Sequence, residues 1–318
     1  MNEILETTKY VVGNSDNVFI DHDALIKVSA EFKDQNMIHW LEDSPIDFNK
    51  FSDEEKLNFV LIFSAISFSY WGNPKWTVEY EDKLIDGSYG LMTAIKRALD
   101  EGVPILDPKY LATLSRQDFE HILRANVPIP LLTERWKILN EIGSVLITKY
   151  GGHFSSLIEK GGKDVNALRR LIVSEIPSFE DSVSYKGKKI FFHKRVQVLI
   201  SDICQLFKGK GYGEFTNANE LTAGADYKLP QILRRFGILT YDKKLAQKID
   251  NKVPLEVGCD EETEIRSNTI WAVELMREEI SKHRKEISAM SINDQLWVLT
   301  QTKKVDDKPY HLVRTTSY

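Results

Sequence analysis

Hydrophobic residues recur every three or four positions along most of this chain, which is the spacing of one face of an α-helix. Extended segments are predicted only at residues 77–80, at 184–192 with Gly187 in a turn, and at 310–318. Helices are predicted over residues 23–34, 52–69, 90–101, 115–125, 132–150, 165–176, 194–207, 230–236, 267–288 and 292–302. The pattern therefore predicts a mostly α-helical fold with a few short strands.

Local signals mark several ends of these helices. Ser52 is followed three residues later by Glu55, which is the spacing of a capping box at a helix N-terminus. Glycine pairs at 151–152 and 161–162 predict loops near the middle of the chain, and we find no internal repeat and no low-complexity linker. We therefore predict a single domain over residues 1–318, with two helical lobes that meet near 151–162.

Composition restricts the class of partner. The chain has 318 residues, of which 42% are hydrophobic and 28% charged, so it has ample material for a large core. Its formal net charge is −5, whereas proteins that hold a long nucleic acid usually carry a basic surplus. We therefore expect no stable nucleic-acid complex, while a small phosphorylated ligand needs only a local basic pocket.

Several segments bear on compartment and metal binding. The two cysteines, Cys204 and Cys259, do not have the spacing of a metal-binding pair. The N-terminal segment is acidic and lacks the apolar core of a secretory signal, and the most apolar stretch, at 57–71, is short for a membrane span. We expect a soluble cytoplasmic protein with no membrane partner, and the sequence leaves the oligomeric state open.

The segment 221–239 holds one carboxylate, Asp226, in a turn of small residues that includes Gly224. A helix is predicted from Pro230 onward, so Asp226 is expected just before a helix N-terminus, where unpaired N–H groups stabilise negative charge. Two interpretations stay open from the pattern alone. Asp226 is either a structural cap or a carboxylate that acts on a ligand.

Other side chains offer binding chemistry as well as plainer structural roles. Lys194 begins a predicted helix beside a histidine and an arginine, where it suits either phosphate binding or a solvated helix start. Tyr70 and Trp71 follow an apolar helix and suit either stacking on a heterocycle or core packing. Trp271 lies on a helix with polar neighbours, so it is either a pocket residue or part of the core.

Three further positions complete the candidates. His39 is a lone histidine, which is more often structural than a ligand. Asp294 supplies an acid beside Asn293 near the start of a predicted helix, where either residue also suits a cap. The sequence has no phosphate-binding glycine loop and no zinc-protease or nucleophile-elbow motif. We therefore expect neither a metal nor a cofactor.

Taken together, these segments resemble the queuosine salvage proteins, which are queuosine 5′-phosphate N-glycosylases. The likeness runs in order from about residue 20 to the end of the chain, and such an ordered set is more specific than any single motif. The matching segments are 67–76, 193–195, 215–223, 225–227, 229–231, 264–266, 269–275 and 314–318. The resemblance implies a helical fold similar in part to the helix-hairpin-helix DNA glycosylases.

The resemblance also implies residue roles. Asp226 matches the essential aspartate of the family, as a nucleophile or as a stabiliser of the transition state, and Lys194 matches a lysine of the same active site. His39 matches a histidine that contacts the base. By the same likeness and by position we expect substrate contacts from these residues: Tyr70, Trp71, Gly224, Tyr227, Trp271, Asn293, Asp294 and Val298.

Three of these positions depart from the family pattern. Gly224 stands where members often carry an aromatic residue, and Asn293 and Val298 stand where acidic residues often contact the side chain of the base. The departures leave the exact base open, whereas the assignment as a glycosidase depends on Asp226 and Lys194.

The resemblance implies an N-glycosidase that releases a queuine-type base and ribose 5-phosphate from queuosine 5′-phosphate or a related 7-deazaguanine nucleotide. The base would then be salvaged for tRNA modification. Two alternatives stay open at this point: a glycosylase acting on bases in DNA or tRNA, and a non-catalytic nucleotide-binding protein on the same scaffold.

Overall fold

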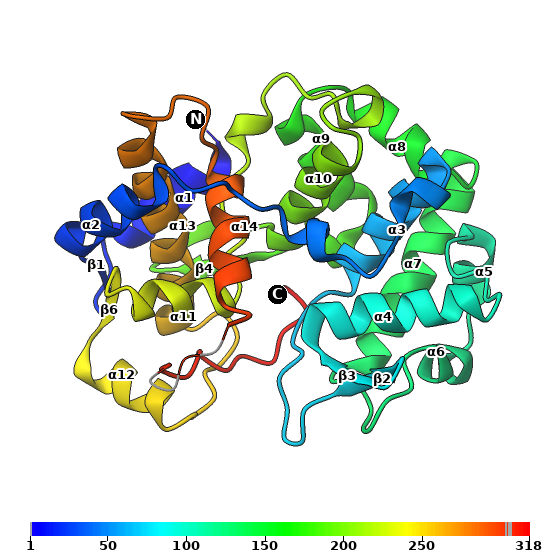
Figure 1. Cartoon of the computed structure of the whole chain (residues 1–318), viewed down its shortest axis with the longest axis horizontal. Helices are drawn as coiled ribbons and strands as arrows, with labels where there is room; N and C mark the ends of the chain where they lie inside the picture. The colour runs from blue at the N-terminus through cyan, green and yellow to red at the C-terminus, as the bar shows by residue number, and fades with distance from the viewer. Residues whose placement is uncertain (1, 303, 305–306) are drawn as a thin grey trace.

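The computed structural model describes residues 2–302, 304 and 307–318, and helices dominate it (Figure 1). The α-helices are α1 Glu3–Val12, α2 His22–Phe32, α3 Asp53–Ala65, α4 Gly87–Asp100, α5 Pro108–Thr113, α6 Arg116–Ile122, α7 Leu132–Tyr150, α8 Phe154–Gly161, α9 Val165–Glu175, α10 Lys194–Leu206, α11 Lys228–Arg235, α12 Lys243–Asp250, α13 Asp260–Ser281 and α14 Ala289–Leu299. Short 3₁₀ helices include η1, Trp40–Asp43. Within the described ranges no helix is long and apolar enough to cross a membrane.

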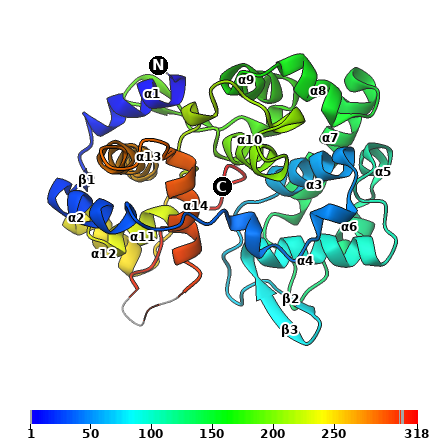
Figure 2. The same ribbon diagram turned by 45° about the horizontal axis from the view of Figure 1, so that its top comes forward.

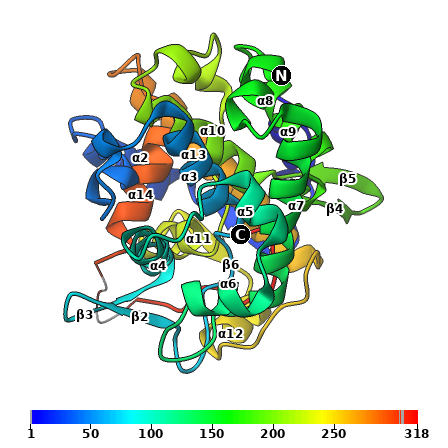
Figure 3. The ribbon, with the colours of Figure 1, turned by 90° about the vertical axis from the view of Figure 1, so that its right-hand side faces the viewer.

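In the part of the chain that the structure describes, six short strands form three separate antiparallel pairs. These pairs are β1 Val18–Ile20 with β6 Leu239–Tyr241, β2 Thr77–Tyr80 with β3 Lys83–Asp86, and β4 Ser182–Tyr185 with β5 Lys188–Phe191. Figure 3 shows the β2–β3 and β4–β5 hairpins at opposite edges of the molecule. The mostly α-helical prediction is confirmed, while the likeness to helix-hairpin-helix glycosylases stays a prediction.

The core divides between two lobes. One large hydrophobic cluster is built from residues between Trp40 and Leu221, together with Met290, and it holds α3 to α10. A second cluster is built from residues 18–32 and 223–318, and a small third one joins α1 to the β4–β5 hairpin. In Figures 1 and 2 the two groups of helices lie side by side, with α14 and the C-terminal end between them.

The glycine pairs at 151–152 and 161–162 do not lie at a boundary between the two hydrophobic clusters. Those glycines flank α8, and Phe154 and Leu157 of α8 pack in the same cluster as Tyr150 before them and Val165 after them. The chain passes from the second cluster to the first between α2 and η1, and back again near residue 222. The division of the chain into domains stays a prediction.

Two predicted helix boundaries shift, one through a contact with the C-terminal tail and one through a local cap. The helix α3 ends at Ala65 rather than at Ser69, because Ser69 has φ 38° and bonds to the C-terminal tail. Its N–H donates to the Tyr318 carbonyl at 2.9 Å, and its hydroxyl donates to the Thr315 carbonyl at 2.6 Å. The helix α13 begins at Asp260, where the Cys259 Sγ caps the first turn, rather than at residue 267.

Candidate active site

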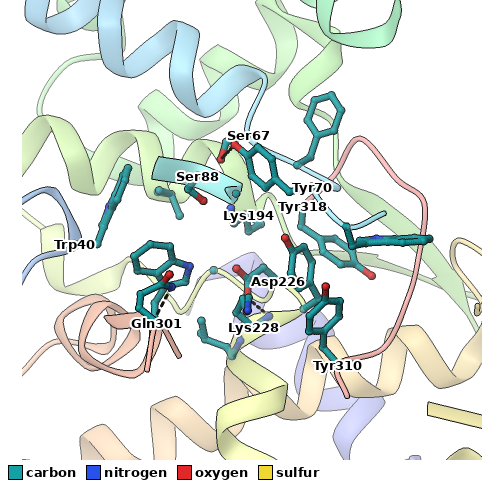
Figure 4. Close-up of a pocket in the computed structure, with 18 of the residues that line it drawn as sticks. Trp40, Ser67, Tyr70, Ser88, Lys194, Asp226, Lys228, Gln301, Tyr310 and Tyr318 are labelled. Atoms are coloured by element: carbon teal, nitrogen blue, oxygen red, sulfur yellow. Dashed lines mark hydrogen bonds between the residues drawn. The ribbon is translucent and has the colours of Figure 1, made fainter. Parts of the chain in front are cut away.

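A cavity lies between the lobes, and both hydrophobic clusters contribute to its walls. Trp40, Phe63 and Tyr70 belong to the first cluster, while Tyr227 and Tyr318 belong to the second. The carboxylate of Asp226 and the side chain of Lys194 face one another across the middle of this space (Figure 4). The cavity is therefore a property of the assembled fold and not of one segment.

Asp226 is held at the N-terminus of α11. Its Oδ1 accepts the backbone N–H groups of Lys228 at 2.7 Å and of Leu229 at 2.9 Å, and the residue is 8% exposed. These bonds and the positive end of the helix dipole stabilise the ionised carboxylate. Both of these backbone bonds end on Oδ1. The residue is thus a cap through one oxygen, while the other oxygen takes no part in the cap.

The local geometry differs from the sequence-based expectation in one detail. The helix α11 begins at Lys228, so Pro230 is its third residue and not its first. Proline is still tolerated there because the first turn of a helix has no partner for its N–H groups.

Lys194 begins α10. The preceding His193 adopts φ 47°, and the Lys194 N–H donates to Asp181 Oδ2 at 3.0 Å. Burial lowers the pKa of Lys194, and the negative charge of Asp226 opposes that shift. The ammonium group is therefore within electrostatic reach of Asp226, and no described residue forms a hydrogen bond with its Nζ.

One buried ion pair connects the backbones that carry these two residues. Arg266 on α13 donates to both oxygens of Asp181, at 2.8 and 2.7 Å, and its Nε donates to the Ala225 carbonyl at 3.2 Å. Although burial opposes ionisation, Arg266 holds the pKa of Asp181 below its usual value. Because Asp181 also accepts the Lys194 N–H, the pair ties the start of α10 to the peptide before Asp226.

Aromatic rings form one end of the cavity. Trp40 stacks on Phe63 with ring centroids 5.2 Å apart and meets Trp297 edge-on at 5.8 Å. Trp40 is fixed because its Nε1–H donates to Asp202 Oδ1 at 2.8 Å. Rings arranged around a slot in this way suit stacking on a planar heterocycle.

The wall near the C-terminal tail is also aromatic. Tyr227 and Tyr310 pack with ring centroids 4.7 Å apart, and the Trp71 indole lies under the Arg314 guanidinium, which is 3.5 Å from its ring centroid. Burial raises the pKa of Tyr70 to about 12, so its hydroxyl keeps its proton and donates to Ser67 Oγ. This wall offers hydroxyl groups and rings, and Asp86 and Lys75 also line the cavity.

Gly224 allows close packing between the turn and α10. A Cβ at this position would lie 3.1 Å from Val198 Cγ2 and 3.3 Å from Lys194 Cγ, which is tighter than ordinary contact. The Gly224 N–H donates to Asn293 Oδ1 at 3.0 Å, and Asn293 Nδ2 donates to Asp294 Oδ1 at 2.9 Å. Asn293 therefore links the turn of Asp226 to Asp294 in the middle of α14.

Comparison with known proteins decides the family. The family model described as "Queuosine salvage protein" matches residues 48–318. The chain belongs to the queuosine salvage protein family. A protein of Sphaerobacter thermophilus named "Queuosine 5'-phosphate N-glycosylase/hydrolase" is 36% identical, over 99% of this chain and 97% of its own. Proteins with the same name from Bos taurus and Schizosaccharomyces pombe are 34% and 28% identical, over 98% and 95% of this chain and 98% and 92% of their own.

The cavity of this queuosine salvage protein gathers most of the residues predicted from the sequence. Eight of them line it: Lys194, Asp226, Tyr70, Trp71, Gly224, Tyr227, Asn293 and Asp294. Their roles toward a substrate stay predictions. Among the described residues no group of three or more His, Cys, Asp and Glu side chains has the arrangement of a metal site.

Three predicted contacts lie elsewhere in the structure. Trp271 is on the outer side of α13, where its Nε1–H donates to Thr8 Oγ1 at 3.1 Å and Lys9 lies over its ring. Val298 is not among the cavity-lining residues and packs against the first hydrophobic cluster. His39 lies behind Asp294, at a second cleft. Helical spacing alone does not tell which face of a helix meets the cavity, and this accounts for Trp271 and Val298.

Several lining residues were not predicted as substrate contacts. Trp40 adjoins His39 in sequence, and Trp297 lies on the same helix as Asp294, so both lie in segments that carry predicted contacts. Tyr310 and Tyr318 reach the cavity from the C-terminal tail (Figure 4). The predicted extended character of 310–318 was the available signal, and contacts with distant residues such as Ser69 and Trp71 bring that tail to the site.

Proposed function

We propose that this protein hydrolyses the N-glycosidic bond of queuosine 5′-phosphate, or of a closely related 7-deazaguanine nucleotide, and releases the free base and ribose 5-phosphate. The observation that carries the proposal is the joint placement of Asp226 and Lys194 in one cavity beside an aromatic slot. The printed name of relatives that align over nearly the whole chain supports the same reaction. A glycosylase acting on nucleic acid is not favoured by those names.

The sugar-side chemistry fits the placement of Asp226. Cleavage of an N-glycosidic bond passes through a state with positive charge spread over the anomeric carbon and the ring oxygen. A fixed carboxylate next to that carbon stabilises this charge, and it does so strongly in a site from which water is excluded. We therefore assign the Oδ2 of Asp226 to the anomeric carbon, with the Lys194 ammonium beside it on the ribose.

The two ends of the cavity suit the two ends of a nucleotide. The Trp40, Phe63 and Trp297 rings would hold the base, because a planar heterocycle stacks on such faces. Tyr310 lies across Asp226 from Trp40 in Figure 4, and the Lys228 ammonium lies 5.2 Å from the Tyr310 ring centroid. We place the 5′-phosphate at this second end, where Lys228 would supply positive charge.

An assay of base release tests the proposal. The protein is incubated with queuosine 5′-phosphate and with queuosine, and free base is measured by mass spectrometry. We expect release from the nucleotide, and we expect Asp226→Asn to lower the rate by at least about 10²–10³-fold, the cost of losing one such electrostatic contact. Near-normal turnover by Asp226→Asn would contradict the mechanism, and no release by the native protein would contradict the function.

A matched variant separates loss of chemistry from loss of a helix cap. Asp242 caps α12 by accepting two backbone N–H groups, as Asp226 does for α11, but it does not line the cavity. Asp242→Asn removes a cap of the same kind and should leave base release unchanged. An equal fall in activity for Asp242→Asn and Asp226→Asn would show that the effect comes from the fold.

A further inference from the structure

A second cleft adjoins the base end of the cavity, and a single acid lies in the wall between them. Asp294 lines both spaces, while His39, Ser201 and Cys204 line only the cleft. Asp294 is buried, and its Oδ1 accepts from Asn293, which also holds the turn of Asp226 through Gly224. Asp226 and Asp294 are thus fixed relative to one another by a short chain of hydrogen bonds.

Two more titratable groups lie against Asp294. His39 Nε2 is 3.5 Å from Asp294 Oδ2 and 3.8 Å from Asp202 Oδ1, and the side chain of Asp202 is fully buried. The Leu41 N–H donates to His39 Nδ1 at 3.2 Å, so Nδ1 is an acceptor. The neutral ring then carries its proton on Nε2, directed at the two carboxyl groups. Neither His39 Nε2 nor Asp202 Oδ2 has a hydrogen-bond partner among the described residues.

This arrangement keeps a proton on the carboxyl groups near neutral pH. Burial raises the pKa of Asp294 to about 7. Burial, together with the charge of Asp294, raises the pKa of Asp202 well above its usual value. Burial lowers the pKa of His39 to about 4, so the ring stays neutral and does not compensate two ionised carboxylates. With a pKa of about 7, Asp294 is about half protonated at neutral pH, which suits an acid that donates a proton to a ligand.

The proposed substrate needs such a donor. A departing purine base accepts a proton at N7, but a 7-deazaguanine base has carbon at that position. Without a proton from elsewhere the base would leave as an anion, which is a poor leaving group. Because Asp294 lies at the base end and Asp226 at the ribose, the two carboxyl groups are placed for the separate tasks of acid and charge stabiliser.

We propose that Asp294 is the general acid that protonates the departing base, and that solvent in the second cleft returns the proton. The inference rests on the hydrolysis proposed above. The bond between the anomeric carbon and the base nitrogen breaks, and its electron pair goes to the base. The carboxyl proton of Asp294 passes to the base, water adds to the anomeric carbon, and the proton that this water loses is released to solvent. Asp294 then takes a proton from the cleft beside His39.

A change of leaving group tests this assignment. The rates of the native protein and of Asp294→Asn are measured with queuosine 5′-phosphate and with 4-nitrophenyl β-D-ribofuranoside 5-phosphate, whose nitrophenolate departs without a proton. We expect Asp294→Asn to lose at least about 100-fold in kcat on the nucleotide, within the range for general acids, and less than about threefold on the nitrophenyl compound. Equal losses on both compounds would overturn the assignment.

The ratio of the two rates is taken within one protein sample, so partial unfolding cancels from it. Asp294→Glu keeps an acid, so its loss of rate on the nucleotide should exceed its loss on the nitrophenyl compound by a smaller factor than in Asp294→Asn. An equally large factor in the two variants would count against a proton-donor role. Asp226→Asn should lose activity on both compounds, because stabilisation at the sugar does not depend on the leaving group. Failure of the native protein to release base from the nucleotide would reject the proposed function itself.

Discussion

Removing the charge of Asp181 should destabilise the fold far more than removing a surface charge. Asp181 and the guanidinium of Arg266 are both 2% exposed and form two parallel hydrogen bonds, at 2.8 and 2.7 Å. In Asp181→Asn the amide oxygen can still accept one hydrogen bond from the guanidinium, but the second acceptor oxygen and the negative charge are lost. A charge is then left buried without its counter-ion.

The expected cost follows from that burial. Breaking a buried ion pair by removing one partner costs about 3–5 kcal/mol, because the remaining charge stays desolvated and no longer has a counter-ion. An exposed pair contributes about 0–1 kcal/mol. The ion pair between Lys163 and Glu214 is such a control, since its side chains are 59% and 56% exposed. Glu214→Gln should therefore change the free energy of unfolding by about 1 kcal/mol or less.

Urea unfolding followed by circular dichroism measures both variants. We also expect the double variant Asp181→Asn/Arg266→Gln to lose less stability than the sum of its single variants, with a coupling of about 0.5–3 kcal/mol, because the double variant no longer buries an unpaired charge. A loss below about 1 kcal/mol for Asp181→Asn, or strict additivity in the double variant, would refute the reasoning that this pair is a coupled, desolvated link between α10 and the turn of Asp226.

Three further predictions concern stability. The pKa of Asp294 is about 7 in the fold against 3.8 for an exposed group, so the free energy of unfolding falls as pH rises from about 4 to 7. Asp294→Asn should therefore be more stable than the native protein by about 4 kcal/mol at pH 8. A stability difference between the two proteins in urea unfolding that does not shrink toward pH 5 would contradict this. Ser52→Ala should cost about 1 kcal/mol in thermal unfolding, because Ser52 and Glu55 form a reciprocal capping box, and an unchanged melting temperature would argue against it. Gly143→Ala should cost about 1–3 kcal/mol or more, because a Cβ there would lie 2.3 Å from the Ala112 nitrogen where α7 packs on α5; a neutral effect would show that the two helices separate easily.

Local chemistry accounts for the parts of the fold that were predicted well. The long helix α7 has the predicted bounds 132–150, because its hydrophobic spacing is regular and Gly151 ends it with φ 63°. A hairpin was predicted over residues 184–192. The observed β4–β5 hairpin begins two residues earlier, at Ser182, and has Gly187 at φ 79° in its turn. The Ser52 capping box is present as predicted. Each of these features depends on residues within a few positions of one another.

Other elements were missed because their stabilising partners are distant in sequence. The helix α1 buries Ile4 and Val11 in a cluster with Ile270 of α13. The hydrophobic residues of the segment itself were not enough to predict this helix. The helix α3 was predicted four residues too long, because the C-terminal tail captures the backbone of Ser69. In both cases packing or hydrogen bonding from far along the chain overrides a local pattern.

The sequence by itself determined the helical class and most helix positions, and through its ordered likeness to one family it singled out Asp226 and Lys194 as candidates. Only the tertiary structure decided what stands around them: that one oxygen of Asp226 caps α11, that Trp40 and Trp297 form the slot, and that Trp271 faces away. The physical reason is that the cavity exists only where two lobes meet. Its walls come from segments hundreds of residues apart, and the pKa of a group such as Asp294 depends on the water that this packing removes.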